Sequence, residues 1–255
     1  MEYLIGFIIA MFIALTGVGA GTITTPLLIL FLGVPTSMAV STGLVFSAAV
    51  KLVLVPSQIA RRQVNWRVLG FMVLGGLPGV LLGSLVLSHL ATAGSTKIMN
   101  GLLGAILVLT AMYQIAFSFR TVSTVQDPPD RVRWLALLMF PVGAEVGFSS
   151  AGAGALGSAA LLSLTSLAPS VVVGTDILFG FLLSLFGSGA HLLQGGGVRQ
   201  ALLRHLIIGG LGGVVVGTIS ARYIPRRPLR FALWVWLFII GAQFLYRNAF
   251  VSMHW

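Results

Sequence analysis

The sequence predicts an all-α protein that crosses a membrane many times, and its composition carries this prediction. Hydrophobic residues make up 57% of the 255 residues, charged residues make up only 8%, and the mean hydropathy is +1.04. A soluble domain would carry about 25% charged residues. Several apolar runs approach the roughly 20 residues with which a helix spans a bilayer. A soluble fold is excluded because so few charges could not cover its surface.

The apolar runs fall into two sets of five. In each set, two short runs flank a glycine-rich stretch and three longer runs follow. We therefore expect two membrane repeats, 1–119 and 134–255, each a broken-helix hairpin followed by three transmembrane helices, forming one integral domain. The polar stretch 120–133 is expected to be an extended cytoplasmic linker, because it contains a Pro-Pro pair and two of the five acids. The runs are 3–16, 22–33, 37–57, 68–88, 98–119, 134–148, 154–167, 170–193, 201–221 and 230–250.

Three blocks of similar residues support an internal duplication. The tripeptide Gly-Ala-Gly occurs at 19–21 and again at 152–154, an offset of 133 residues. The same offset relates Thr42 to Thr175 and Phe46 to Phe179. Further on, GGLPGVLLGS at 75–84 matches GGLGGVVVGT at 209–218 with an offset of 134. The order and spacing of the blocks favour duplication over chance similarity among oily segments, and many transporters are built from such repeats.

Topology follows from counting membrane crossings. A short pair that forms a hairpin returns the chain to the side it came from, so each half makes an odd number of net crossings and the repeats are inverted. The basic residues then divide ten against four between the two sides, which is a positive-inside bias that places both termini outside. If each short pair were instead one broken helix that crosses, the division would be nine against five.

The remaining composition excludes several classes of site. The chain has no cysteine, and its four histidines are scattered, so we expect no disulfide, metal or other cofactor. No enzyme motif is present, since Gly187-Ser188-Gly189 lacks the spacing of a nucleophile elbow. The formal charge of +10 is attributed to loop arginines that meet lipid headgroups, and no nucleic-acid partner is expected.

The stretch GVGAGTITTP at 17–26 predicts a helix break at membrane depth. Irregular backbone is tolerated there only where protein buries it or water reaches it. The N–H groups and the dipole at the start of the next half-helix favour an anion. Two such breaks, converging near the midplane, would form an anion site; the alternative is a kink that serves helix packing. The candidate substrate-binding residues of the two breaks are Gly19, Gly21, Thr22, Thr24, Gly152 and Gly154.

Four ionisable residues lie in or near the apolar runs, where charges are costly. Lys51 could face an anionic substrate, or its side chain could extend to the surface that holds Arg61. Glu145, Asp176 and His191 are candidates for a proton relay that couples transport. The alternative is that each of these three is structural or lies at the end of a helix.

These motifs together resemble the sulfite exporter TauE/SafE family. Each half opens with a glycine-rich break (GVGAGTITTPLLI and SSAGAGALGSAALL), continues with AVSTGLVFS or VVGTDILFG, and ends its next helix in a GGxxGxxxGS/T pattern. The resemblance covers essentially the whole chain and implies a multi-pass transporter in a bacterial inner membrane. It also implies a small sulfur-containing anion, such as sulfite or an organosulfonate, as substrate. The second break lacks the threonines and proline of TITTP, so only the glycine runs are carried over.

The leading hypothesis is a secondary transporter that exports such an anion by alternating access, and not an enzyme. A passive anion channel would use the same half-helix dipoles. A cation permease would use Asp176 and Glu145 as ligands, and an accessory membrane subunit would need its glycines only for packing. The expected partners are the anion and the lipid bilayer. A homodimer stays open, because the glycine faces at 75–83 and 209–217 can pack within one chain or between two.

Overall fold

A computed structural model describes residues 2–16, 19–119, 132–221 and 226–250. These residues form ten α-helices and no strand, which confirms the expected all-α class. Seven of them, namely α3, α4, α5, α6, α8, α9 and α10, are long and apolar enough to span a membrane, while α1 and α2 are shorter apolar helices. The helices are α1 (Glu2–Thr16), α2 (Ala20–Leu32), α3 (Thr36–Ala60), α4 (Trp66–Thr92), α5 (Thr96–Phe119), α6 (Val132–Ser149), α7 (Ala153–Leu164), α8 (Pro169–Leu193), α9 (Gln200–Ser220) and α10 (Arg226–Phe250).

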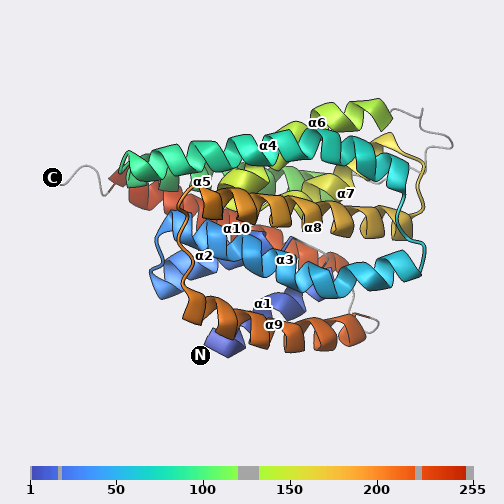
Figure 1. The fold of residues 1–255 in the computed structure, drawn as a ribbon, viewed down its shortest axis with the longest axis horizontal. Helices are drawn as coiled ribbons and strands as arrows, with labels where there is room; N and C mark the ends of the chain where they lie inside the picture. The colour runs from blue at the N-terminus through green and yellow to red at the C-terminus, as the bar shows by residue number, and fades with distance from the viewer. Residues whose placement is uncertain (1, 17–18, 120–131, 222–225, 251–255) are drawn as a thin grey trace.

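The helices lie side by side, mostly along the long axis of the molecule (Figure 1). The chain turns at 61–65 and 165–168 at one end, and at 33–35, 93–95 and 194–199 at the other. We call the first the arginine-rich end; the described part of the chain places Arg61, Arg62, Arg67, Arg133, Arg226, Arg227 and Arg230 there. Residues 120–131 of the expected linker, as well as Arg222, lie outside the described residues, so the linker and the full division of charges stay predictions.

The first helix of each half packs against the fourth helix of the other half. In the α4–α6 pair, a Cβ added to Gly75 would collide with the backbone of Ala136. In the α1–α9 pair, a Cβ added to Gly209 would collide with the backbone of Tyr3. Glycine is therefore required at both positions, because the helix backbones touch there. The glycine faces at 75–83 and 209–217 thus pack within this chain.

These contacts repeat at the offsets found in the sequence. The Phe46 ring of α3 lies where a Cβ on Gly210 of α9 would be, and the Phe179 ring of α8 lies where a Cβ on Gly76 of α4 would be. Phe46 and Phe179 are related by 133 residues, and Gly76 and Gly210 by 134. Equivalent residues of the two halves therefore make equivalent contacts with the opposite half.

Helices α3 and α8, the third helix of each half, run antiparallel through the middle of the molecule. The Ser184 hydroxyl donates to the Ser47 hydroxyl at 3.0 Å. Toward the end opposite to the arginines, Gly196, just after α8, approaches Ser41. Residue numbers thus rise along one helix as they fall along the other. Antiparallel packing of equivalent helices is what two inverted repeats would produce.

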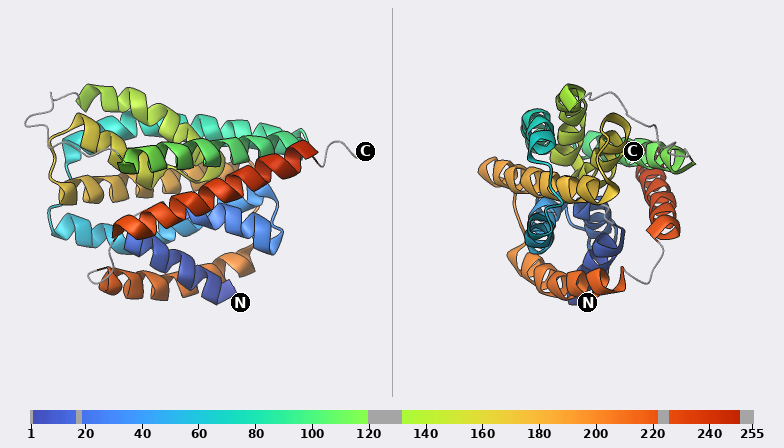
Figure 2. Two further views of the ribbon diagram at one scale, coloured as in Figure 1. Left: turned by 180° about the vertical axis from the view of Figure 1, so that it is seen from behind. Right: turned by 90° about the vertical axis from the view of Figure 1, so that its right-hand side faces the viewer.

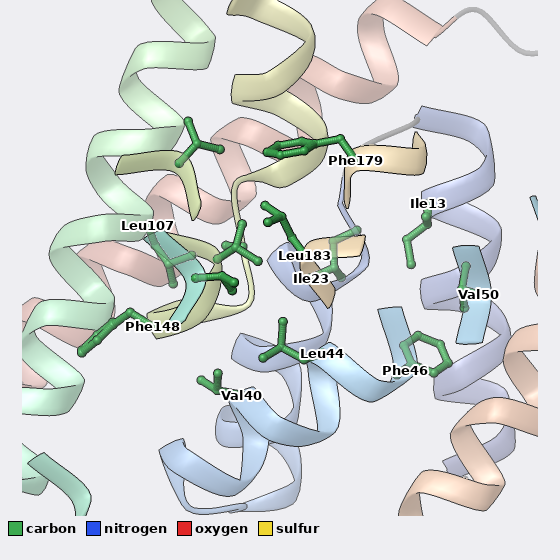
Figure 3. Packing of buried hydrophobic residues seen from close by; sticks show 14 of the residues in the cluster. Ile13, Ile23, Val40, Leu44, Phe46, Val50, Leu107, Phe148, Phe179 and Leu183 are labelled. Carbon is green, nitrogen blue, oxygen red and sulfur yellow. The ribbon is translucent and has the colours of Figure 1, made fainter. Parts of the chain in front are cut away.

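The two half-helices α2 and α7 lie inside this frame. Seen from behind, α2 turns back from α1 (Figure 2). Apolar side chains from both halves form one continuous buried cluster. Figure 3 shows part of it, with Ile23 of α2, Leu44 of α3 and Leu183 of α8 pointing into a shared core. This core fixes the positions of the breaks.

Candidate functional site

Both glycine-rich stretches interrupt a helix inside the protein. Gly19 caps α2 with extended backbone angles (φ −56°, ψ 136°), and its carbonyl accepts a hydrogen bond from the Thr22 amide at 3.1 Å. Gly152 caps α7 with φ of +91°, a left-handed conformation that favours glycine. Ser150, two residues earlier, also has a positive φ of 60°. Gly17 lies outside the described residues.

The two breaks touch each other at Ser150. A Cβ on Gly21 would collide with the backbone carbonyl of Ser150, so only glycine permits this approach. The hydroxyls of Ser150 and Thr25 lie 2.5 Å apart, and the Ser150 hydroxyl also donates to the Gly21 carbonyl at 3.3 Å. Segments 129 residues apart in the chain are thereby joined near the middle of the bundle.

A cavity of about 270 Å³ lies between these breaks and the arginine-rich end. We call it the basic cavity; its lining includes Lys51, Leu54, Arg61, Gly154, Asp176 and Arg230. Lys51 and Asp176 are only 5% and 3% exposed, whereas Arg61 at the end of α3 is exposed. The cavity therefore leads from a buried pair of charges to the surface at the arginine-rich end.

Asp176, the buried acid of the basic cavity, accepts a side-chain hydrogen bond at one of its two carboxylate oxygens. The Ser158 hydroxyl of α7 donates to Asp176 Oδ2 at 2.5 Å. The other oxygen, Oδ1, is buried and has no hydrogen-bond partner within the described part of the chain. Lys51 and Arg230 are the cations whose charges act on this carboxylate. A buried charge needs such compensation, because its desolvation is expensive.

Arg230 is held by the end of the first broken helix. Its Nε donates to the carbonyl of Thr16, the last residue of α1, at 2.5 Å. A guanidinium placed on the last carbonyls of a helix also meets the negative end of the helix dipole. Arg230 therefore connects the end of α1 to the cavity.

The start of α7 supplies a further source of positive potential. Gly154, in the first turn of α7, lines the basic cavity. The first amides of a helix have no partners within that helix, and they carry the positive end of its dipole. With three basic side chains and one acid, the lining fits a small anion.

Glu145 lies outside the basic cavity. The Thr110 hydroxyl of α5 donates to Glu145 Oε1 at 2.6 Å. The Glu145 carboxylate also lies against the position that a Cβ on Gly152 would occupy. It lines a separate, largely apolar hollow of about 340 Å³ between α4, α5 and α6. Glu145 and Asp176 therefore do not share a site.

His191 lies toward the end opposite to the arginines. Its Nε2 is 2.8 Å from the carbonyl oxygen of Gly147, so it connects the last turn of α8 to α6. It follows Asp176 by 15 residues on α8, which is about 22 Å along a helix. His191 and Asp176 are thus separated by most of a membrane span.

The first-break residues predicted from the sequence are buried near the core. Thr22 and Thr24 are almost fully buried, and neither they nor Gly19 and Gly21 are among the residues that line the basic cavity. Thr22 Oγ1 has no hydrogen-bond partner within the described residues. Their role in binding stays a prediction, while Lys51, Asp176 and Gly154 of the predicted set come together.

Sequence reasoning missed Arg230 and Arg61 as cavity residues, because it treated both as loop residues that set orientation. One signal was present for Arg230. It follows Pro228, which begins the apolar part of α10, so it sits within the helix rather than in the preceding loop. Nothing in the local sequence around Arg61 distinguishes it from its neighbour Arg62.

The whole chain also matches known proteins. The sequence model of the sulfite exporter TauE/SafE family matches residues 3–244. The chain belongs to this family. TauE/SafE relatives include the probable membrane transporter protein YjnA of Bacillus subtilis (strain 168), 32% identical over 252 residues that cover 95% of this chain and 98% of that protein. The probable membrane transporter protein YunE of the same organism is 24% identical over 257 residues, which cover 93% of each chain. No solved structure matches this TauE/SafE transporter.

Proposed function

We propose that this TauE/SafE protein is a secondary transporter of a small sulfur-containing anion such as sulfite or an organosulfonate. The observation that carries the proposal is the basic cavity, whose lining combines Lys51, Arg61 and Arg230 with a single acid, Asp176, and with Gly154 at the start of the half-helix α7. Charge-assisted bonds from such groups are the usual means of holding oxyanions. Membership of a sulfite exporter family supports the choice of substrate class.

Transport proceeds by alternating access of two inverted repeats in this proposal. The basic cavity extends to the arginine-rich end, where Arg61 is exposed. Toward the opposite end, the bundle is held by the bond between His191 and the Gly147 carbonyl and by the Thr36 hydroxyl, which donates to Asn100 Oδ1 at 2.5 Å. If the arginine-rich end is cytoplasmic, as the positive-inside rule implies, the conformation is open inward and both termini lie outside.

The experiment measures anion-dependent thermal stability of the purified protein. Sulfite, thiosulfate, sulfate, sulfoacetate, taurine, chloride and nickel are compared. A ligand at about 100 times its Kd stabilises the folded state by about 2.7 kcal/mol. We expect one sulfur oxyanion or sulfonate to stabilise the protein. Lys51→Ala and Arg230→Ala should each weaken its binding about tenfold to a hundredfold, the usual cost of a lost bond to a charged group.

Arg204→Ala is the matched control, because Arg204 is an exposed arginine on α9 outside the cavity. It should bind the anion as the parent protein does. Unchanged binding in both cavity variants would contradict the assigned site. Stabilisation by nickel alone, lost in Asp176→Asn, would favour a cation permease. Anion flux that shows no exchange-driven counterflow in vesicles would favour a passive channel.

A further inference from the structure

Entry of an anion would change the charge balance of the basic cavity, because it adds a second negative group beside Asp176. Without a substrate, the Asp176 carboxylate is opposed by Lys51 and Arg230. An anion bound by the same two cations would compete with this carboxylate for them. Two negative groups that share a buried site repel each other strongly, and one of them is then driven to take up a proton.

We propose that Asp176 binds the coupling proton, so that anion and proton enter the cavity together and cross the membrane together. This inference rests on the proposed anion transport and adds its driving ion. In chemical terms, the Asp176 carboxylate accepts one proton from the water of the compartment to which the cavity opens, and it becomes a neutral carboxylic acid. The anion then takes over Lys51 and Arg230, and both ligands are released on the other side.

The two carboxylate oxygens of Asp176 have different surroundings, and this difference indicates which oxygen is protonated. Oδ2 already accepts the Ser158 hydroxyl, whereas the buried Oδ1 has no hydrogen-bond partner within the described residues. Oδ1 also occupies the space where a Cβ on Gly157 would be, so glycine at this position is what lets the oxygen lie against α7. The proton is therefore expected on Oδ1.

The groups that face Asp176 argue against a metal ion in place of the proton. Lys51 approaches from α3 and Arg230 from α10, with Arg61 farther along the cavity, while α7 contributes two neutral donors, the hydroxyl and the backbone amide of Ser158. A sodium ion would be repelled by these cations and would need several oxygen ligands. A proton needs no additional space or ligands. Asp176 is also the only acid among the described residues that line the cavity.

The inference fixes the charge moved in one transport cycle. A monoanion that crosses with one proton carries no net charge, so the membrane potential does not drive it. A dianion that crosses with one proton carries one negative charge. Because linkage is reciprocal, the proton strengthens anion binding by the factor by which the anion strengthens proton binding. Anion affinity should thus rise as the pH falls, by up to about tenfold per pH unit for one coupled proton.

The test uses the full chain in lipid vesicles that contain a pH-sensitive dye. Sulfate, thiosulfate and methanesulfonate are used because they stay fully ionised throughout the titration, so any pH effect belongs to the protein. An inward gradient of the transported anion should acidify the vesicle interior, and an imposed pH gradient should drive anion accumulation. Asp176→Asn, which mimics the neutral acid, should retain exchange of labelled anion, lose both coupled responses and bind the anion with the same affinity at every pH.

Glu145→Gln is the matched control, because it neutralises a half-buried acid that lies outside the basic cavity, and it should keep both coupled responses. The inference is overturned if the parent protein moves the anion without a change in internal pH, if a sodium gradient replaces the pH gradient, or if Asp176→Asn still couples. The first two outcomes need no variant, so they decide the matter even if Asp176→Asn does not fold. If neither these three anions nor sulfite, sulfoacetate and taurine bind to the parent protein, the proposed function fails and the coupling fails with it. Anion binding with no pH dependence defeats the coupling alone.

Discussion

The two glycine-rich breaks have similar sequences, but the structure uses them differently. In the first break, Gly19, Gly21, Thr22 and Thr24 are buried, and Gly21 packs directly against the Ser150 carbonyl. The second break contains the two positive φ angles, at Ser150 and Gly152, and its Gly154 lines the basic cavity. Two similar motifs therefore have different structural roles: the first joins the two breaks, and the second forms part of the cavity wall.

The long helices beside the breaks show the same divergence. Asp176 of α8 corresponds to Gly43 of α3, which packs against Thr25 and Ser150 of the two breaks. Lys51 of α3 corresponds approximately to Ser184 of α8, whose hydroxyl bonds to Ser47. Each ionisable residue thus corresponds, at the repeat offset, to a small or neutral residue in the other half. The two halves share a frame, and each contributes one charged residue that the other lacks.

The largest loss of stability is expected from a substitution where the two breaks touch. Gly21→Leu would place a side chain into the backbone of Ser150, which a rotamer change cannot relieve. Overpacking of a well-packed core typically costs about 1–3 kcal/mol, and more where backbone must move. We expect Gly21→Leu to yield little monodisperse protein, as measured by size-exclusion chromatography and thermal unfolding in detergent.

Gly70→Leu is the control for this change. Gly70 lies on α4, where nothing comes within 4 Å of an added Cβ, and it is exposed on the bundle surface. This variant should purify as the parent protein does. If Gly21→Leu were as stable as Gly70→Leu, the contact between the breaks would not anchor the fold.

A smaller loss of stability is expected from a substitution at the left-handed glycine of the second break. Gly152→Ala forces a residue with a Cβ to keep φ near +91° and also brings that Cβ against the Glu145 carboxylate. A left-handed backbone alone costs about 1–2 kcal/mol for a non-glycine residue. The melting temperature of Gly152→Ala should be clearly lower than that of the parent protein. Gly19→Ala changes the equivalent cap, where φ is −56°, so its melting temperature should fall less. If both variants lost the same amount of thermal stability, the difference in backbone conformation between the two caps would not matter for stability.

Much of this architecture was predictable from the sequence, because membrane helices follow a simple length and hydropathy rule. The ten apolar runs correspond to the ten helices, and the repeats GGLPG and GGLGG appear as helix contacts at Gly76 and Gly210. The cavity was only partly predictable. Lys51 and Asp176 stood out because charges are rare in membrane segments, but their proximity depends on the antiparallel register of α3 and α8, which local sequence does not encode.

The smallest change in stability is expected from a substitution at Thr22. This variant also tests whether the first break binds substrate. Thr22 Oγ1 is buried and has no hydrogen-bond partner in the described part of the chain, so its desolvation is not compensated there. Replacing a buried, unpaired hydroxyl with a methyl group of similar shape is nearly neutral or stabilising, here by up to about 1 kcal/mol. Thr22→Val should therefore melt at the same temperature as the parent protein or slightly higher, with unchanged anion affinity. A Thr22→Val protein that folds normally but binds the anion weakly would place the first break in the binding site, and the basic cavity would then be the entrance to that site.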